Sequence, residues 1–223
     1  CSGKDRRPVT PGAQLHANFS LSPDGEFLGL YNAEVPRRLV SEFNPYPNQR
    51  TDYSWGFDPL DQMKYFQTQT PGISNGVSSI TGVVADTKFS HKRGFYTAPF
   101  SLSITCATPA VTIRYTMDGT APTATSGLVY STPFPIAKTT VVRAAAYSNG
   151  SLPSDVDAQT YLFLSDVIYQ STNGVAPPGW PATWGANVVD YGMDPDIVNA
   201  AAYKDTIKSD LQAIPTFSIV ADV

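Results

Sequence analysis

Apolar residues recur at every second position over several short stretches of this chain, which is the pattern of β-strands that bury one face. The alternating stretches are SLSITC (101–106), VTIRYT (111–116), GLVYS (127–131), TTVVRAAAY (139–147) and DAQTYLF (157–163). Turn residues separate them, including the Asp118-Gly119 pair that is typical of a tight hairpin turn. This spacing predicts a β-sandwich of about seven strands over residues 77–163.

The N-terminal part of the chain is also predicted to be β-rich. Residues 16–32 contain two short apolar stretches around the turn Pro23-Asp24-Gly25, and residues 37–43 (RRLVSEF) predict another strand. Residues 44–62 are rich in Pro, Asn and Asp, so we expect a loop there. A second loop is expected over residues 67–76, and it marks a candidate domain boundary.

The pattern changes after residue 163. Residues 193–214 predict a helix, because Asp194 suits an N-cap and Pro195 suits the first turn. A break within this helix is compatible with the pattern. The apolar stripe of this helix would contain Ile197, Ala201, Ile207 and Leu211. Residues 215–223 (PTFSIVADV) predict a buried strand, and the Pro-rich stretch before residue 185 predicts an extended linker.

Composition narrows the function classes. Hydrophobic residues make up 42% of the chain and charged residues 15%, against about 25% charged residues in an average soluble domain. The chain is therefore too apolar to be disordered. The net charge is −4 and no basic stripe is visible, so no nucleic-acid partner is expected. No apolar run approaches the ~18 residues of a membrane span.

The chain contains two cysteines, Cys1 and Cys106. Cys106 ends an alternating stretch, so the favoured interpretation is a buried free thiol in or beside a β-core. A disulfide between the two residues is the alternative.

One segment resembles a known family. The motifs are Tyr115-Thr116-x-Asp118-Gly119-Thr120-x-Pro122, Arg143-Ala144-x-Ala146 and Thr160-Tyr161. With them, residues 93–163 resemble the C-terminal β-sandwich domain of chitobiases and β-hexosaminidases. The resemblance implies an immunoglobulin-like accessory domain.

Two further resemblances concern the flanking segments. Residues 1–76 resemble the second part of a bacterial lamin-tail domain, which is also immunoglobulin-like. Residues 164–223, with "PPGWPATWG" and "DYGMDP", resemble the lead-in to a CotH-type, spore-coat kinase-like domain. Together they imply a mainly β piece of a secreted, multi-modular bacterial protein. Its three parts are a partial lamin-tail domain (1–76), a complete sandwich (77–163) and a linker, helix and strand (164–223).

A G-x-S-x-G motif at residues 72–76 raises a catalytic alternative. Ser74, Asp86 and His91 follow one another in the chain order of a serine-hydrolase triad. The mechanism requires a strand before the serine and a helix after it, and "TP" and "VSSITG" flank this motif instead. We therefore expect a turn at Ser74 and no catalytic residues, with the triad as the disfavoured alternative.

Aromatic residues next to acidic ones are candidate carbohydrate contacts, because the C–H face of a sugar ring packs on an aromatic ring. Asp52, Tyr53, Trp55 and Asp58 lie together in one predicted loop, which also contains Asp61. Packed surface residues are the simpler interpretation, and acid–base glycoside chemistry by the loop aspartates is a weaker one. Trp180 and Trp184 form a second candidate platform, or they fix the Pro-rich linker to the sandwich.

No cofactor is expected. The two histidines, His16 and His91, have neither a second His nor a Cys pair at ligand spacing, so no metal site is predicted. Calcium at the loop aspartates is a weak alternative. Asp118 is expected to stabilise its own turn in preference to holding a cation.

Three functions are compatible with these observations. The favoured one is a non-catalytic accessory or scaffold fragment of a secreted or cell-surface protein, with a polysaccharide or cell-surface glycan as candidate partner. A hydrolase is the second, through Ser74, Asp86 and His91 or through the loop aspartates. A self-associating structural protein is the third, because open strand edges invite pairing between chains.

Overall fold

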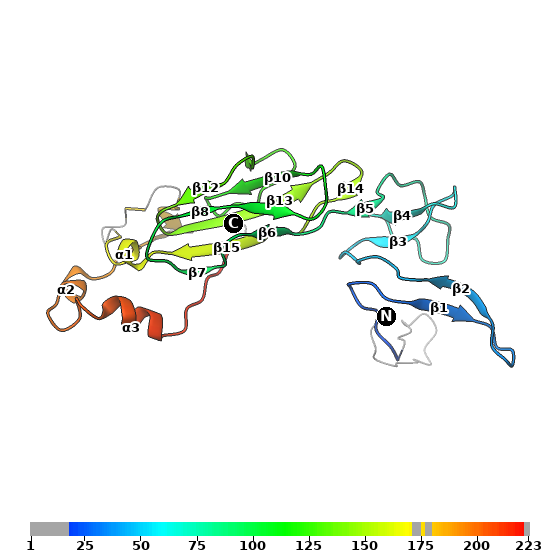
Figure 1. Ribbon diagram of the computed structural model, residues 1–223, viewed down its shortest axis with the longest axis horizontal. Helices are drawn as coiled ribbons and strands as arrows, with labels where there is room; N and C mark the ends of the chain where they lie inside the picture. The colour runs from blue at the N-terminus through cyan, green and yellow to red at the C-terminus, as the bar shows by residue number, and fades with distance from the viewer. Residues whose placement is uncertain (1–17, 171–174, 177–179, 221–223) are drawn as a thin grey trace. The chain divides into compact units, whose positions relative to one another are not determined.

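The computed structural model describes residues 18–170, 175–176 and 180–220, and the chain is mainly β, as predicted (Figure 1). The chain divides into two compact units, with the division between Val83 and Val84. Each unit is described below by itself. The predicted domain limits at residues 76 and 163 stay predictions.

The described part of the first unit contains two antiparallel hairpins. Strand β1 (Leu28–Tyr31) pairs with β2 (Leu39–Phe43), and β3 (Ser54–Phe57) pairs with β4 (Met63–Phe66). A short strand, β5 (Gly82–Val83), ends the unit. The strand predicted over residues 37–43 is thus confirmed as β2.

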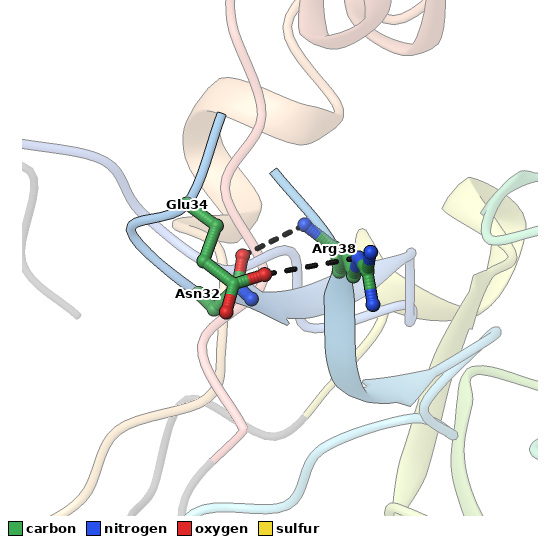
Figure 2. A network of polar contacts seen from close by, with 3 residues as sticks. All are labelled: Asn32, Glu34 and Arg38. Carbon is green, nitrogen blue, oxygen red and sulfur yellow. Dashed lines mark hydrogen bonds and ion pairs between the residues drawn. The ribbon is translucent and has the colours of Figure 1, made fainter. Parts of the chain in front are cut away.

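The turn between β1 and β2 is built by polar contacts (Figure 2). The side-chain oxygen of Asn32 accepts the main-chain N–H of Arg38 at 2.8 Å, and the Asn32 N–H donates to the Arg38 carbonyl at 3.0 Å. The Arg38 guanidinium lies 3.7 Å from the Glu34 carboxylate. Because both charged side chains are exposed, this ion pair adds little to the stability that the main-chain bonds supply.

Two strands were predicted on either side of Pro23-Asp24-Gly25. Among the described residues only the one after this turn forms, and it is β1. Gly25 has a φ of 91°, and its α-carbon lies against the carbonyl of Tyr46, where a β-carbon would collide. The hydroxyl of the buried Tyr46 donates to the Ser22 carbonyl at 3.0 Å. This contact fixes the turn from a distant segment.

The prediction of a loop over all of residues 44–62 is wrong, because β3 lies within it. The ring of Trp55 packs edge-on against Phe43, with centroids 5.0 Å apart. The carboxylate of Asp58 accepts two main-chain N–H groups of the following turn, each at 2.8 Å. The Pro and Asp residues therefore mark a hairpin turn, and the aromatic side chains hold a strand beside it.

The second unit contains a five-stranded sheet in the order β11-β10-β13-β15-β7. The strands are β7 (Gly94–Phe95), β10 (Thr112–Thr116), β11 (Leu128–Val129), β13 (Thr140–Tyr147) and β15 (Asp157–Leu162). All neighbours are antiparallel except β15 and β7, which are parallel. Four of these strands confirm stretches predicted from alternation.

Shorter strands complete the unit. They are β6 (Thr87–Phe89), β8 (Phe100–Leu102), β9 (Ile104–Cys106), β12 (Phe134–Ile136) and β14 (Ser151–Leu152). The stretch predicted as one strand over 101–106 is divided at Ser103, because β8 pairs with β12 whereas β9 pairs with β6. Ser103 donates its N–H to the Ser90 hydroxyl at 2.9 Å, which satisfies the main chain at the division.

One core joins the β8–β12 pair to the inner face of the large sheet, as in a sandwich. Its buried residues are Leu102, Ile136, Val142, Tyr161 and Phe163. The ring of Phe100 meets the ring of Tyr161 edge-on, with centroids 5.1 Å apart. Burying each of these side chains stabilises the fold by about 1.5–3 kcal/mol, so this cluster is the main source of stability in the unit.

A loop covers part of the outer face of the large sheet. Residues 117–127 connect β10 to β11, and three side chains of the sheet donate to main-chain carbonyls of this loop. Arg143 donates to Gly119 O at 2.9 Å, Arg114 to Gly127 O at 2.9 Å and Tyr147 to Pro122 O at 2.6 Å. We call this the 117–127 loop; its attachment explains why Arg143 is buried on the face opposite to the core.

The described residues of the C-terminal part form a short hairpin and three helices. They are α1 (Leu164–Val167), β16 (Thr183–Trp184), β17 (Asn187–Val188), α2 (Pro195–Val198) and α3 (Ile207–Ala213). The helix predicted over 193–214 is therefore broken after α2. The predicted cap is confirmed, since the Asp194 carboxylate accepts the Asp196 N–H at 2.9 Å.

Two predictions for this part are wrong. Ile197 and Ala201 are exposed, and Val198 is buried instead with Ile168 and Ile207. Residues 215–220 form no strand; the side chains of Phe217 and Ile219 are 87% and 91% exposed. Because the predicted helix is broken after α2, the four residues of the predicted stripe do not share one helix face; Ile207 is buried and Leu211 packs against it. No neighbouring strand among the described residues pairs with 215–220.

Candidate functional site

Two neighbouring cavities lie in the second unit, and both are lined by Met117 and Trp180. We call them together the Trp180 groove. The first has a volume of about 600 Å³ and is lined by Pro135–Thr140, Asp166 and Gln170. The second has a volume of about 380 Å³. Both volumes fall within the ~300–1,000 Å³ that is typical of small-molecule sites.

The indole of Trp180 is held in place by its own linker. The ring of Tyr191 meets it edge-on, with centroids 5.2 Å apart and an interplanar angle of 82°. The Tyr191 hydroxyl donates to the Pro181 carbonyl at 2.9 Å. Because Trp180 is only half-buried, one part of a fixed indole remains available to the groove.

The polar wall of the first cavity is ordered by Thr139, which is buried. The Thr139 hydroxyl accepts the Phe163 N–H at 3.1 Å, and the Thr139 N–H donates to the Asp166 carboxylate at 3.1 Å. These bonds tie the β12–β13 connection to α1 and hold the half-buried Asp166 at the cavity. Exposed Lys138 and half-buried Gln170 add one cation and one amide to the lining.

The second cavity lies over the outer face of the large sheet. Val141, Thr160 and Leu162 line it from β13 and β15, and residues 216–220 form another wall. The hydroxyls of Thr160 and Ser218 are hydrogen-bonded at 2.6 Å, which anchors this segment to the sheet. The cavity is therefore bounded by elements that are far apart in the sequence.

Asp118, at the edge of the second cavity, stabilises its own turn as predicted. Its carboxylate accepts the Thr120 hydroxyl at 2.7 Å and the Thr120 N–H at 3.0 Å. Hydrogen bonding from the Thr120 side chain, and then from its N–H, lowers the pKa of Asp118. Gly119 follows with a φ of 85°, which glycine adopts without strain.

Ser74 lies exposed in a loop, and neither a strand immediately before it nor a helix after it is present in this described part of the chain. The catalytic geometry of a G-x-S-x-G turn is therefore missing around it. In the second unit, the Asp86 carboxylate accepts the Asp155 N–H at 3.1 Å, and His91 Nδ1 lies 2.9 Å from the Ser90 hydroxyl. The triad stays a disfavoured prediction.

The aromatic and acidic candidates of the first unit belong to its hairpins. Trp55 and Tyr53 are half-buried, and Asp52 is exposed with a φ of 63° at the turn before β3. Asp58 is 6% exposed and is engaged by the hairpin turn described above. The structure thus gives Asp58 a structural task, and carbohydrate binding by the four residues stays a prediction.

Trp184 differs from Trp180 in its surroundings. It lies in β16, is 78% exposed and makes no ring contact with Trp180 within the described residues. The two indoles therefore do not form the single stacked platform suggested by their spacing. Of these two tryptophans, only Trp180 lines the groove.

Several groove residues were not predicted from the sequence. Met117, Lys138, Asp166 and Gln170 come from three separate segments, and none carries a local motif. The turn at residues 117–119 and Trp180 were the available signals. Only the tertiary arrangement brings these segments together.

The predicted free thiol at Cys106 is confirmed, but the thiol is half-buried and donates to the Ala85 carbonyl at 3.0 Å. Cys1 and His16 lie outside the described residues. Within the residues described, no three His, Cys, Asp or Glu side chains gather as metal ligands would. Calcium stays an untested prediction. No helix of the described segments is long and apolar enough to cross a membrane.

A family model, the chitobiase/beta-hexosaminidase C-terminal domain, matches residues 91–158. The match lies within the second unit and supports the resemblance predicted for residues 93–163. No curated protein and no solved structure matches the chain. The predicted lamin-tail and CotH-type resemblances stay predictions.

Proposed function

We propose that this chain is a non-catalytic accessory part of a secreted, multi-modular protein and that it attaches this protein to polysaccharide. The observation that carries the proposal is the match of residues 91–158 to a domain that accompanies carbohydrate-active enzymes. The mainly β fold fits a rigid accessory module. Secretion, a bacterial source and the lamin-tail and CotH-type neighbours are parts of the same proposal.

The physical basis is the amphipathic chemistry of sugars. A pyranose ring has an apolar C–H face and a rim of hydroxyl groups, so it needs an aromatic surface beside fixed polar groups. The second unit offers a half-buried indole next to a carboxylate and an amide in the Trp180 groove. No reactive step is needed for this task.

The proposal is tested by retention of the purified chain on insoluble chitin, cellulose, xylan and bacterial peptidoglycan. The chain should sediment with at least one of these and be released by the matching soluble oligosaccharide. Serum albumin at the same concentration controls for non-specific adsorption. Absence of retention on all four, at physiological salt, would refute the proposal.

A second candidate function is self-association, and exposed apolar side chains of the first unit favour it. Leu30, Val35, Val40 and Val77 are 63%, 97%, 62% and 82% exposed. Exposed apolar surface on short two-stranded sheets favours pairing between chains. Light scattering of the chain as it elutes from a size-exclusion column tests self-association. A dimer or larger species supports self-association, and a monomer at ~100 μM excludes it.

A further inference from the structure

We infer that the Trp180 groove is the polysaccharide-binding site and that it accepts uncharged pyranose chains; this inference rests on the proposed function. It selects one site among the aromatic candidates of the sequence. It also names the polar partners of the sugar, which no local motif reveals.

Trp180 is the indole best prepared for stacking. Tyr191 fixes its orientation, so little side-chain freedom is lost when a ligand packs on it. The indole of Trp184 is 78% exposed on a short hairpin, and that of Trp55 packs edge-on against Phe43. Neither of these two lines the groove.

The polar lining suits hydroxyl groups. Asp166 accepts one main-chain N–H, from Thr139, which fixes its carboxylate beside the cavity and leaves further acceptor positions on its oxygens. Gln170 offers both a donor and an acceptor, and Lys138 offers a donor. Two neighbouring hydroxyl groups of a sugar can donate hydrogen bonds to the Asp166 carboxylate. The same hydroxyl groups can accept hydrogen bonds from the Gln170 amide or the Lys138 ammonium group.

The charges of the groove select against anionic polysaccharides. Asp118 and Asp166 line the cavities with two carboxylates, and Lys138 provides one ammonium group. Hydrogen bonding keeps the pKa of Asp118 low, so it carries its charge at neutral pH. A uronate chain would bring more negative charge to a lining that already has an excess of it.

The shape of the groove sets the length of the ligand. The two cavities share Met117 and Trp180, so a chain that fills both passes over the indole. A monosaccharide fills only part of one cavity. Affinity is therefore expected to rise from the monosaccharide to the tetrasaccharide.

The test uses the whole chain with only one tryptophan left. The sequence contains three tryptophans, so the double variant Trp55→Phe/Trp184→Phe retains Trp180 alone. Cellotetraose, chitotetraose and tetragalacturonate are titrated while Trp180 fluorescence and binding heat are recorded. At least one neutral tetrasaccharide should shift the emission to shorter wavelength and bind at least tenfold more tightly than tetragalacturonate and than its own monosaccharide.

Single variants assign the contacts. Trp180→Ala should weaken binding at least tenfold, and Gln170→Ala about fivefold, whereas Trp184→Ala should change it less than twofold. Far-ultraviolet circular dichroism and the melting temperature show whether each variant is folded. If the Trp180→Ala variant is unfolded, the affinity of the Gln170→Ala variant and the Trp180 fluorescence signal decide whether the groove binds the oligosaccharide.

The outcomes separate the two proposals. If the chain is retained on a polysaccharide while neither the Trp180 emission nor the Trp180→Ala and Gln170→Ala affinities change, the groove is overturned and the proposed function stands. Tighter binding of tetragalacturonate overturns the charge argument. If no polysaccharide or oligosaccharide binds, both proposals fail.

Discussion

At the scale of single residues, polar side chains on the outer face of the large sheet do much of the positioning. Tyr147 and Arg143 lie on the same strand and each holds a carbonyl of the 117–127 loop. This loop carries Met117 and Asp118 to the Trp180 groove. The geometry of the groove therefore depends on hydrogen bonds outside it.

Replacing Tyr147 with Phe tests this positioning. The change removes the donor to the Pro122 carbonyl, and one such bond contributes about 1 kcal/mol. The urea midpoint of the second unit should fall by an amount that matches this loss, with an unchanged m-value. Tyr169→Phe is the matched control, because Tyr169 is 70% exposed, and it should leave the midpoint unchanged. Equal midpoints for the two variants would contradict the assignment.

Tyr161 gives the fold a dependence on alkaline pH. Its side chain is fully buried, its hydroxyl donates to the His91 carbonyl at 3.0 Å, and burial, with a smaller effect from Tyr96, raises its pKa. An unfolded tyrosine loses its proton near pH 10. Above that pH the unfolded state binds fewer protons than the folded state, so stability is complete below about pH 10 and falls as the pH rises further.

Two measurements follow this effect. Urea unfolding at pH 8, 10 and 11 should show a falling free energy of unfolding, and Tyr161→Phe should make the decrease shallower above pH 10. In a spectrophotometric titration near 295 nm, one tyrosine of the folded chain should ionise only with unfolding. Full ionisation of all twelve tyrosines in a still folded protein would show that Tyr161 is not protected.

At the scale of elements, the 117–127 loop contains both a motif that is visible in the sequence, the Asp118-Gly119 turn, and residues that line the Trp180 groove. Its turn at Asp118-Gly119 was predicted, because a side chain that bonds its own turn and a glycine with positive φ are local features. Its attachment to the sheet was not predicted, since Arg143 and Tyr147 come from a strand more than twenty residues away. Local chemistry is visible in the sequence, whereas long-range hydrogen bonds are not.

Gly127 is a position at which this loop tolerates little change. Its φ is 88°, and an added β-carbon would lie 3.0 Å from the Tyr115 carbonyl oxygen. Gly127→Ala should therefore cost about 1–3 kcal/mol and lower the melting temperature of the second unit. Gly76→Ala adds the same methyl group where nothing lies within 4 Å, and it should be close to neutral. A neutral Gly127→Ala would mean that the loop does not hold this conformation.

The strands show the same limit of sequence analysis. Alternation located β10, β13 and β15 because each buries one face in the core. It failed for β3, whose aromatic residues stand among turn formers, and for residues 215–220, whose apolar positions are exposed. In both segments the tertiary surroundings decide the structure, and the alternation of side chains does not describe these surroundings.

At the scale of the whole molecule, the second unit has the more complete core. Its central cluster draws five buried residues from its own strands and their continuation. In the described part of the first unit, the buried apolar residues are Tyr46, Tyr65 and Phe66. Stability is therefore concentrated in the unit that contains the groove.

Separate expression of the parts tests this distribution. A fragment of residues 84–223 should unfold in one cooperative transition, because its core needs no residue from the first unit. A fragment of residues 1–83 should show a broad, weakly cooperative transition by circular dichroism. The reverse result, with cooperativity only in the N-terminal fragment, would contradict the assignment of the core.

In the sequence, the site itself was visible only through Trp180 and the turn at Asp118-Gly119. The carboxylate and amide beside it are ordinary surface residue types until the β12–β13 connection and α1 bring them to one cavity. Conversely, the Ser74 motif was conspicuous in the sequence, and the structure surrounds it with neither of the elements that a catalytic turn requires. Motif spacing alone could not decide between these two candidates.

The most direct test of the account measures retention and turnover in one sample. The chain and its Ser74→Ala variant are incubated with each insoluble polysaccharide and with a p-nitrophenyl ester, and bound protein, released reducing ends and released p-nitrophenol are measured over one day. The account predicts retention of both proteins and no release of either product above a protein-free blank. Reducing ends above the blank would contradict it and identify a glycoside hydrolase, and p-nitrophenol release that the Ser74→Ala change abolishes would contradict it and identify a serine esterase.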